Sequence, residues 1–254
     1  MRTSSSPVAA GRFTRRAATG CLILLMLPAA LLAYFWYSVW HAGHVNAQRK
    51  EAATAFVLAQ ARHASDSTSR ALSSSRSTAP DALIGVIRRH TQAPVIVYDR
   101  AHGTYTATVS WSSFYTEEAI LLAAGPIEVE RCFTLTSVRT PRGTWETKPV
   151  ERDRGACAPS RMISADVALA QKRIKTMAAE KVTRAEVARV LDPADQQRPY
   201  SVKRVRRSDE AVVVTVLVRE NGDGTPVQQC YAFTRSLGAD ADAQPVTAVP
   251  VATC

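Results

Sequence analysis

The sequence predicts an α+β protein with one N-terminal membrane-spanning helix. Two repeated units follow it, each made of helices and an antiparallel sheet and each closed by one disulfide. Three observations lead to this prediction: a long uncharged run at residues 20–40, a cysteine-containing pattern that recurs at one offset, and several short segments rich in β-branched residues. With 46% hydrophobic and 21% charged residues, the composition is that of an ordinary globular chain, which excludes wholesale disorder.

The predicted membrane anchor comprises residues 20–40, GCLILLMLPAALLAYFWYSVW, which carry no charge. A helix rises about 1.5 Å per residue, so roughly 20 apolar residues cross the hydrocarbon core of a bilayer. Arginines without acids precede this run, and aromatic residues cluster near its end. A basic flank and an aromatic belt predict that residues 1–19 form a cytoplasmic tail and that the protein is a single-pass protein of the cell membrane.

A cleaved secretory signal peptide is the alternative interpretation of the same segment. The apolar region would then be residues 21–33, and Val45-Asn46-Ala47 would supply the small residues of a cleavage site. A long aromatic stretch separates the two, which favours the anchor, but the sequence leaves cleavage open. In both cases we expect residues 41–254 to lie outside the cytoplasm.

An internal repeat organises the remainder of the chain. Val129–Thr136 and Val227–Thr234 share a valine, a cysteine, an aromatic residue and a threonine at one offset of 98. Upstream, Thr78–Asp81 matches Thr183–Glu186 at an offset of 105. Because the matches occur in the same order, we interpret them as a tandem repeat. The predicted extracytoplasmic units are residues 41–160 and residues 161–254.

The exterior contains four cysteines, Cys132, Cys157, Cys230 and Cys254. An even number of cysteines in an oxidising compartment indicates two disulfides, and four cysteines allow three pairings. The repeat selects Cys132–Cys157 and Cys230–Cys254. Each bond would close a loop of about 25 residues and contribute roughly 3 kcal/mol in the chain-entropy model. The chain has no C-x-x-C motif, so we expect a structural role for both bonds.

The first unit is predicted to begin with helices and to continue with strands. Residues 46–64 have apolar positions at helical spacing, whereas the Ser-rich residues 65–77 are either a flexible linker or a poorly formed continuation of that helix. A short helix is expected at 79–90, capped by Thr78 and with Pro80 in its first turn. Strands are predicted at 95–98, 104–111, 127–138 and 144–150, and Glu117–Ala124 is ambiguous between helix and strand.

The second unit is predicted to repeat this plan. Ser164–Lys181 has a helical apolar stripe, and Thr183 with Glu186 forms the capping box of a short helix. Asn221–Gly224 is a strong hairpin signal because glycine and asparagine tolerate positive φ. Strands are predicted at 200–206, 211–219, 228–235 and 246–251.

This order of elements resembles the nuclear-transport-factor-like and cystatin-like folds, in which helices cover one face of a curved antiparallel sheet. The resemblance is one of layout alone and extends over most of residues 41–254. Membrane-anchored proteins with such domains occur in bacterial conjugation and type IV secretion machines, so the resemblance implies such an assembly as one possible host. Fold by itself does not establish function.

The sequence contains none of the catalytic signatures H-E-x-x-H, G-x-S-x-G or a glycine-rich phosphate loop. His41 and His44 have no acidic or cysteine ligand near them in sequence, so no metal and no cofactor is predicted. Glu128 and Glu130 share a strand face, but Arg131 follows them directly. We interpret this pair as part of a solvated strand.

Two sets of candidate contact residues remain. Lys203, Arg204, Arg206 and Arg207 form the densest basic cluster, which either protects a sheet edge from aggregation or contacts an anionic partner. No aromatic residues alternate with these cations, so no nucleic-acid partner is expected. A concave sheet of this kind can also form a ligand pocket. Its candidate lining residues are Tyr98, Tyr105, Trp111 and Tyr231.

The expected function is that of a non-catalytic interaction module, anchored in the membrane and in contact with another protein of the bacterial cell envelope. The alternative is an anchored or secreted protein that binds a small ligand or lipid, and a hydrolase with an unrecognised site is a third hypothesis. The sequence does not identify the partner, the pathway or the oligomeric state.

Overall fold

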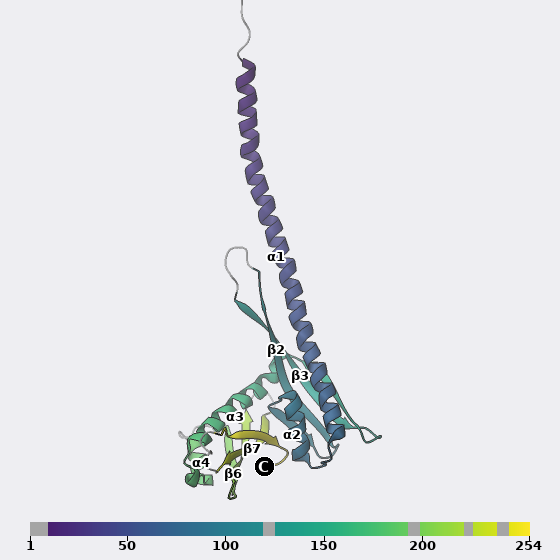
Figure 1. The fold of residues 1–254 in the computed structure, drawn as a ribbon, viewed down its shortest axis with the longest axis vertical. Coiled ribbons are helices and arrows are strands. Elements are labelled where there is room, and N and C mark those ends of the chain that lie inside the picture. Colours follow the sequence, from purple (N-terminus) through teal and green to yellow (C-terminus); the bar gives the residue numbers. More distant parts are fainter. Residues whose placement is uncertain (1–9, 119–124, 193–198, 221–225, 238–243) are drawn as a thin grey trace, which may run out of the picture. The chain divides into compact units, whose positions relative to one another are not determined.

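The computed structural model describes residues 10–118, 125–192, 199–220, 226–237 and 244–254, and within the first range it describes side chains from residue 26 onward. The helices are α1 (Ala10–Ser74), α2 (Pro80–Thr91), α3 (Ala158–Thr176) and α4 (Arg184–Leu191). The strands are β1 (Val95–Asp99), β2 (Thr104–Thr116), β3 (Pro126–Arg139), β4 (Trp145–Arg152), β5 (Tyr200–Arg207), β6 (Ala211–Glu220), β7 (Val227–Ser236) and β8 (Thr247–Val251), all drawn in Figure 1.

The strands form two four-stranded antiparallel sheets, and in each sheet every strand pairs with the next one along the chain. The first sheet has the order β1-β2-β3-β4 and the second the order β5-β6-β7-β8. This confirms the predicted α+β class with two antiparallel sheets. The predicted turn at Asn221–Gly224 and the ambiguous residues 119–124 lie outside the described part of the chain.

The contacts divide the chain into two compact units. One contains Met1–Ala53 and Phe114–Glu128, and the other contains Thr54–Ser113 and Val129–Cys254. Within the first unit, the Asn46 amide donates to the Glu118 carbonyl at 3.0 Å and accepts from the Glu118 N–H at 2.7 Å. The second unit contains both hydrophobic cores. The predicted repeat boundary between residues 160 and 161 falls inside α3.

Alternation along the strands builds both cores. On β6, Val212, Val214, Val216 and Val218 are at most 1% exposed and pack with α3 and α4. Fully burying one such side chain contributes about 1.5–3 kcal/mol. In the other core, the second half of α1 and the apolar face of α2 pack against β1, β2 and β3. Each sheet therefore buries one face under helices, as the alternation predicted.

The Ser-rich segment is a regular part of α1, which continues to Ser74, so the linker interpretation of residues 65–77 is wrong for most of that segment. Its serines bind β4, an edge strand of the first sheet. Ser65 Oγ donates to the Thr147 carbonyl at 2.6 Å, and Ser69 Oγ accepts from the Thr147 N–H at 2.9 Å. One turn on, Ser73 Oγ accepts from the Trp145 N–H at 2.8 Å.

These three serines, spaced by four residues, occupy one side of the helix, which we call the serine face. An edge strand presents unpaired N–H and C=O groups, and the serine face satisfies three of them. Tertiary hydrogen bonds thus outweigh the weak helix propensity of serine.

The two predicted caps have different outcomes. Thr183 caps α4, and its hydroxyl accepts from the Glu186 N–H at 3.3 Å, as predicted. The predicted Thr78 cap of α2 is wrong, because the N-cap is Ala79 and makes no side-chain cap bond. The Asp81 carboxylate instead accepts from the Ala252 N–H at 2.7 Å, close to the end of the chain.

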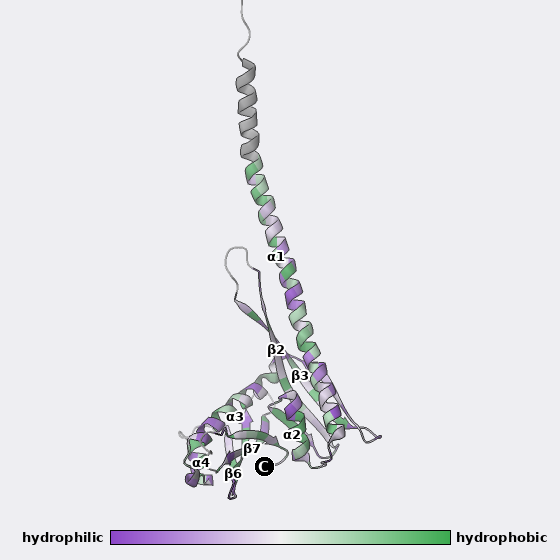
Figure 2. Cartoon of the chain, viewed as in Figure 1, coloured by the Kyte–Doolittle hydropathy of each residue, from purple (hydrophilic) through white to green (hydrophobic). Residues whose placement is uncertain are grey.

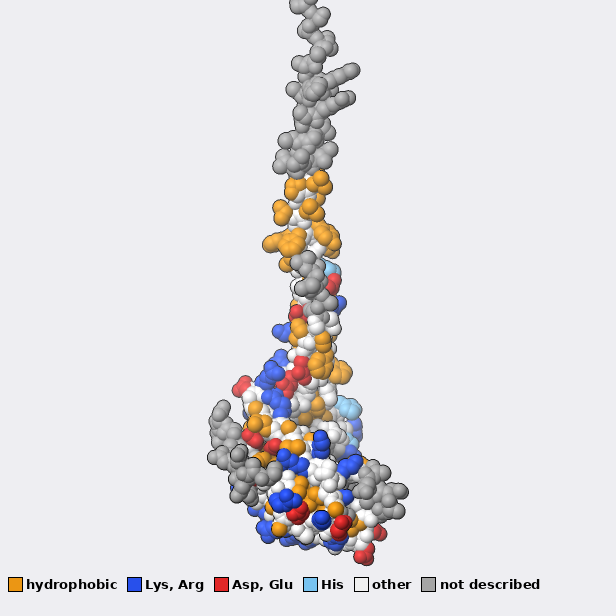
Figure 3. Space-filling view, turned by 90° about the vertical axis from the view of Figure 1, so that its left-hand side faces the viewer, with side chains coloured by type: hydrophobic (Ala, Val, Ile, Leu, Met, Phe, Trp, Pro, Cys, Tyr) orange, Lys and Arg blue, Asp and Glu red, His pale blue; other side chains and the backbone are white. Residues whose placement is uncertain are grey.

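The first part of α1 with described side chains, residues 26–40, is rich in hydrophobic residues (green in Figure 2), and Figure 3 shows their side chains on the surface of the helix. Its large apolar side chains are exposed, for example Leu31 at 66% and Trp36 at 77%. Among the described residues, no helix is both long enough and apolar enough to cross a membrane. The side chains of residues 20–25, which begin the predicted span, lie outside the described part.

Candidate functional site

Both predicted disulfides are present. Cys132 on β3 is bonded to Cys157, and Cys230 on β7 is bonded to Cys254, with Cα–Cα distances of 5.6 and 5.5 Å. Each bond joins the third strand of a sheet to a residue that follows the fourth strand. In each sheet the disulfide therefore holds the segment that follows the last strand against the sheet, and in the second sheet that segment ends at Cys254.

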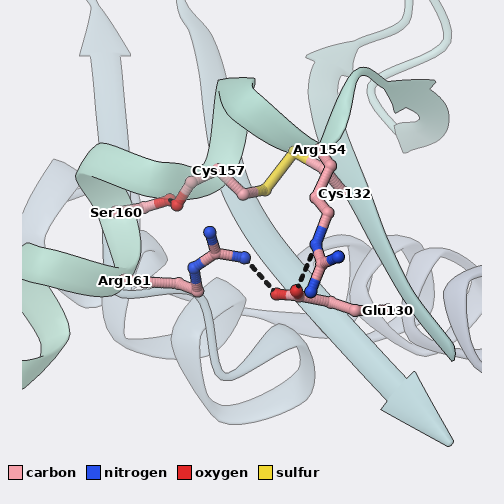
Figure 4. The surroundings of a disulfide bond; sticks show 6 residues. All are labelled: Glu130, Cys132, Arg154, Cys157, Ser160 and Arg161. Carbon is pink, nitrogen blue, oxygen red and sulfur yellow. Dashed lines mark hydrogen bonds and ion pairs between the residues drawn. A yellow bond between two sulfur atoms is a disulfide. The ribbon is translucent and has the colours of Figure 1, made fainter. Parts of the chain in front are cut away.

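Beside the first disulfide lies a charged cluster that the sequence did not predict (Figure 4). Glu130 precedes Cys132 by two residues on β3, and its side chain is only 10% exposed. Its carboxylate accepts from Arg154 Nε at 3.0 Å and also binds the Arg161 guanidinium. The interpretation of Glu130 as a solvated strand residue is therefore wrong, because two arginines from the segment after β4 cover it.

The arginines keep the carboxylate ionised. Burial raises the pKa of Glu130, but the hydrogen bonds from Arg161 and Arg154 outweigh it, so the net pKa is lowered. A nearby hollow of about 470 Å³ is also lined by charged groups, among them Arg131, whose guanidinium donates to Glu151 at 3.1 Å. These acids and bases are largely paired with one another, which fits a structural clamp better than proton transfer.

The strongest candidate for ligand binding is a pocket of about 430 Å³ at the hairpin end of the first sheet, which we call the aromatic pocket. Tyr98 and Tyr105 are cross-strand partners on β1 and β2, and their rings stack with centroids 4.7 Å apart. Trp145, at the start of β4, meets Tyr105 at a centroid distance of 5.6 Å. The volume lies in the range typical of small-molecule sites.

Hydroxyl groups surround the rings. Ser73, Ser75 and Ser77, from the end of α1 and the segment after it, line the pocket. Each oxygen accepts a backbone N–H: Ser73 from Trp145 at 2.8 Å, Ser75 from Ser77 at 3.3 Å, and Ser77 from Ala79 at 3.2 Å. These bonds hold the hydroxyls at the rim, because each oxygen is tied to a fixed backbone group.

Two basic side chains complete the rim. His102 lies in the β1–β2 turn, where its ring binds the Asp99 carboxylate at 2.5 Å. The hydrogen bond from His102 outweighs the effect of burial and lowers the pKa of Asp99. Arg139, at the end of β3, is exposed and donates through Nε to the Gly143 carbonyl at 3.4 Å. The pocket thus combines an aromatic floor with hydrogen-bond donors and the Arg139 guanidinium.

The four aromatic residues predicted to line a pocket do not share one. Tyr98 and Tyr105 line the aromatic pocket, whereas Trp111 is 9% exposed and packs against Phe133 at a centroid distance of 5.4 Å. Tyr231 belongs to the core of the second sheet, is 1% exposed, and donates its hydroxyl to the Pro94 carbonyl. Sequence reasoning missed Trp145, although its place near the start of the predicted strand 144–150 was a usable signal.

The predicted basic cluster lies on β5, which is an edge strand of the second sheet. All four side chains, Lys203, Arg204, Arg206 and Arg207, are exposed. The register with β6 shifts between Val202 and Arg204, as in a β-bulge. Exposed cations on a bulged edge disfavour strand addition by another chain and also form a surface for anions.

The two histidines His41 and His44 of α1 make aromatic contacts. The His41 ring stacks on Tyr37 at a centroid distance of 5.7 Å, and the His44 ring stacks on Trp40 at 5.9 Å. Across the described side chains, no group of three or more His, Cys, Asp or Glu residues is placed to hold a metal ion.

No protein-family model matches the chain, and no curated protein sequence matches it. Among solved structures, one match is an "Ntf2 like protein involved in plasmid conjugation" with 13% sequence identity. The match covers 62% of this chain and 74% of that chain, with a TM-score of 0.16. At this score the likeness supports no conclusion about the function of the chain.

Proposed function

We propose that the chain is a non-catalytic interaction module of the bacterial cell envelope, anchored by residues 20–40, with residues 41–254 outside the cytoplasm. The observation that carries the proposal is the pair of disulfides, Cys132–Cys157 and Cys230–Cys254. Disulfides form and persist in oxidising compartments and are rare in the reducing cytosol. Their presence in both sheets supports export of this whole part of the chain.

The anchor is supported by the sequence and by exposure. Residues 20–40 contain no charged residue, and the described side chains within this run are apolar and mostly exposed. Exposed apolar side chains around the whole circumference of a helix require an apolar environment, which a lipid bilayer supplies.

The interaction role is supported by a rigid link between the two sheets. Gln229 on β7 is 4% exposed, and its Oε1 accepts from the Ile96 N–H at 2.9 Å. Its amide Nε2 donates to the carbonyls of Cys230 and Val251, each at 3.1 Å. A fully bonded buried amide fixes β1 against the second sheet, so both sheets present surfaces in a fixed relation to a partner. A conjugation or secretion assembly is one candidate host, on the layout resemblance alone.

Membrane topology tests the anchor. Alkaline phosphatase fused after residue 254 in bacterial cells is expected to be active, because that enzyme folds only outside the cytoplasm, and the chain is expected to stay with membranes after alkaline carbonate extraction. Leu31→Asp with Leu32→Asp is expected to abolish both results, since each acid costs about 2.5–3.5 kcal/mol at the centre of a spanning helix. Ala47→Asp with Ala52→Asp is the matched control. Release of a shortened chain by carbonate would instead establish a cleaved signal peptide.

Crosslinking tests the interaction role. Native membranes are crosslinked under non-reducing conditions, and the digest is analysed by mass spectrometry. We expect reproducible links from residues 41–254 to another envelope protein. Crosslinks confined to this chain would contradict the interaction module.

The aromatic pocket favours a second candidate function, binding of a small ligand or lipid. Its stacked Tyr98 and Tyr105 rings, the Trp145 ring and the hydroxyl rim form a concave site of suitable volume. This function is compatible with the interaction role and does not depend on the membrane anchor.

A further inference from the structure

We propose that the aromatic pocket binds a small anionic amphiphile, with its apolar body against Tyr98 and Trp145 and its carboxylate or phosphate group at Arg139. The inference rests on the ligand-binding function proposed above and specifies the class of ligand.

The shape sets the size and polarity of the body. Leu72, Leu83 and Val138 supply aliphatic walls, and Tyr105, which is 2% exposed, forms the floor. A volume of about 430 Å³ lies near the lower end of the range for small-molecule sites. The pocket therefore accommodates one ring system or a short alkyl chain, and part-exposed Tyr98 and Trp145 offer apolar surface to it.

The rim offers several hydrogen-bond donors. The oxygens of Ser73, Ser75 and Ser77 already accept backbone N–H groups, while each hydroxyl keeps a hydrogen to donate. Burial, followed by the nearby Tyr98 and Asp81 groups, raises the pKa of Tyr105 to about 12, so its phenol stays protonated at neutral pH. A group with several acceptor oxygens, such as a carboxylate or phosphate, complements this rim.

The charges favour an anion as well. Arg139 lines the pocket, and its long contact to Gly143 engages Nε, so the N–H groups on its two Nη atoms remain to donate to a ligand. The acids nearest to the pocket are already engaged: Asp99 binds His102, and Asp81 accepts from the Ala252 N–H. Neither carboxylate is bonded to Arg139, so its guanidinium can pair with an anionic group of a ligand.

The experiment measures binding of three probes to the full chain in zwitterionic lipid nanodiscs, with empty nanodiscs as the blank for partitioning. The probes are 4-phenylbutyrate, phenyl phosphate and the uncharged 4-phenylbutanamide, and isothermal titration calorimetry is the readout. We expect one or both anions to bind about tenfold to a hundredfold more tightly than the amide, the range of a charge-assisted hydrogen bond. The two anions distinguish a carboxylate ligand from a phosphate ligand.

Variants locate the binding site. Arg139→Gln is expected to remove the preference for anions, whereas Tyr98→Ala is expected to weaken binding of all three probes by about tenfold. Arg142→Gln is the matched control, because Arg142 lies in the same β3–β4 turn but does not line the pocket. Unchanged circular dichroism and urea midpoints establish that each variant is folded.

The outcomes separate the two levels of the proposal. Equal binding of all three probes, insensitive to Arg139→Gln, would overturn the anionic assignment and leave the ligand-binding function in place. Binding of none of the probes to the folded wild-type chain would overturn both. Binding that Tyr98→Ala leaves unchanged would place the ligand elsewhere and refute the pocket assignment.

Discussion

Replacing Ser69 by alanine is expected to destabilise the protein, because the serine face would lose its central contact with β4. Ser69 Oγ accepts from the Thr147 N–H at 2.9 Å and donates to the Ser65 carbonyl at 3.0 Å. Thr147 is 6% exposed, so water cannot readily replace the lost acceptor. Leaving a buried donor without a partner costs about 1–3 kcal/mol, while the better helix propensity of alanine returns about 0.5 kcal/mol. The free energy of unfolding should fall by about 1–2 kcal/mol.

The other serines provide a graded series. Ser65→Ala should lower the free energy of unfolding by as much as Ser69→Ala does. Ser65 is 3% exposed, and its hydroxyl donates to the carbonyl of the same buried residue, Thr147. Ser73→Ala should lower the free energy of unfolding by less than about 1 kcal/mol. Ser73 is exposed, so water can bind the Trp145 N–H in its place. Ser74→Ala is the matched control, because its exposed hydroxyl bonds only the Ala71 carbonyl of its own helix.

Urea unfolding of the full chain in nanodiscs, followed by tryptophan fluorescence, measures the series. The urea midpoint should be highest for Ser74→Ala, lower for Ser73→Ala, and lowest for Ser65→Ala and Ser69→Ala. The slope of the unfolding free energy against urea concentration should be the same for all four variants. If Ser69→Ala proved as stable as Ser74→Ala, the serine face would not be what holds the end of α1 on the sheet.

Three further predictions concern the second compact unit and use the same unfolding assay. Gln229→Leu should lower the free energy of unfolding by about 2–3 kcal/mol, because the Ile96 N–H loses its acceptor in a buried place; a neutral effect would contradict a rigid link between the sheets. Glu130→Gln should cost about 1–3 kcal/mol at neutral pH by weakening the bonds to its two arginines. Because the pKa of Glu130 is lowered from 4.5 in the folded state, its stabilisation is complete above about pH 4.5 and is lost as the pH falls through the folded pKa. The urea midpoint of wild type should therefore approach that of the variant in acid, and parallel pH profiles would refute the assignment. Cys230→Ser with Cys254→Ser should cost roughly 3 kcal/mol for a closed loop of 24 residues, and an unchanged midpoint would show that this bond contributes nothing.

Local patterns allowed much of the fold to be predicted. Alternating valines of β6 and the capping pair Thr183 and Glu186 act within one strand or one helical turn, so sequence spacing is enough to recognise them. The disulfide pairing was predicted because the repeat correlates segments 98 residues apart. Both sheets and both disulfides follow from these signals.

The errors arose where a side chain has a distant partner. Ser65 and Thr147 are 82 residues apart, so a serine-rich segment that resembles a linker becomes a helix by binding a strand edge. Glu130 and Arg161 are 31 residues apart. The sequence around Glu130 is that of a solvated strand residue, but the Arg161 guanidinium binds its carboxylate in the folded chain. Composition and periodicity carry no information about such pairs, because they report only near neighbours along the chain.

The sequence by itself determined the α+β fold class and the positions of nearly all the described strands, because these depend on periodicity and caps. It also determined the pairing of the four cysteines outside the predicted anchor, because that pairing follows from the repeat. Only the tertiary structure decided the candidate site. It separated Tyr231 and Trp111 from the aromatic pocket and added Trp145, the rim serines and Arg139. The physical reason is that a pocket consists of residues brought together where a helix end meets two hairpin ends, and packing of the sheet, rather than spacing along the chain, sets which residues meet there.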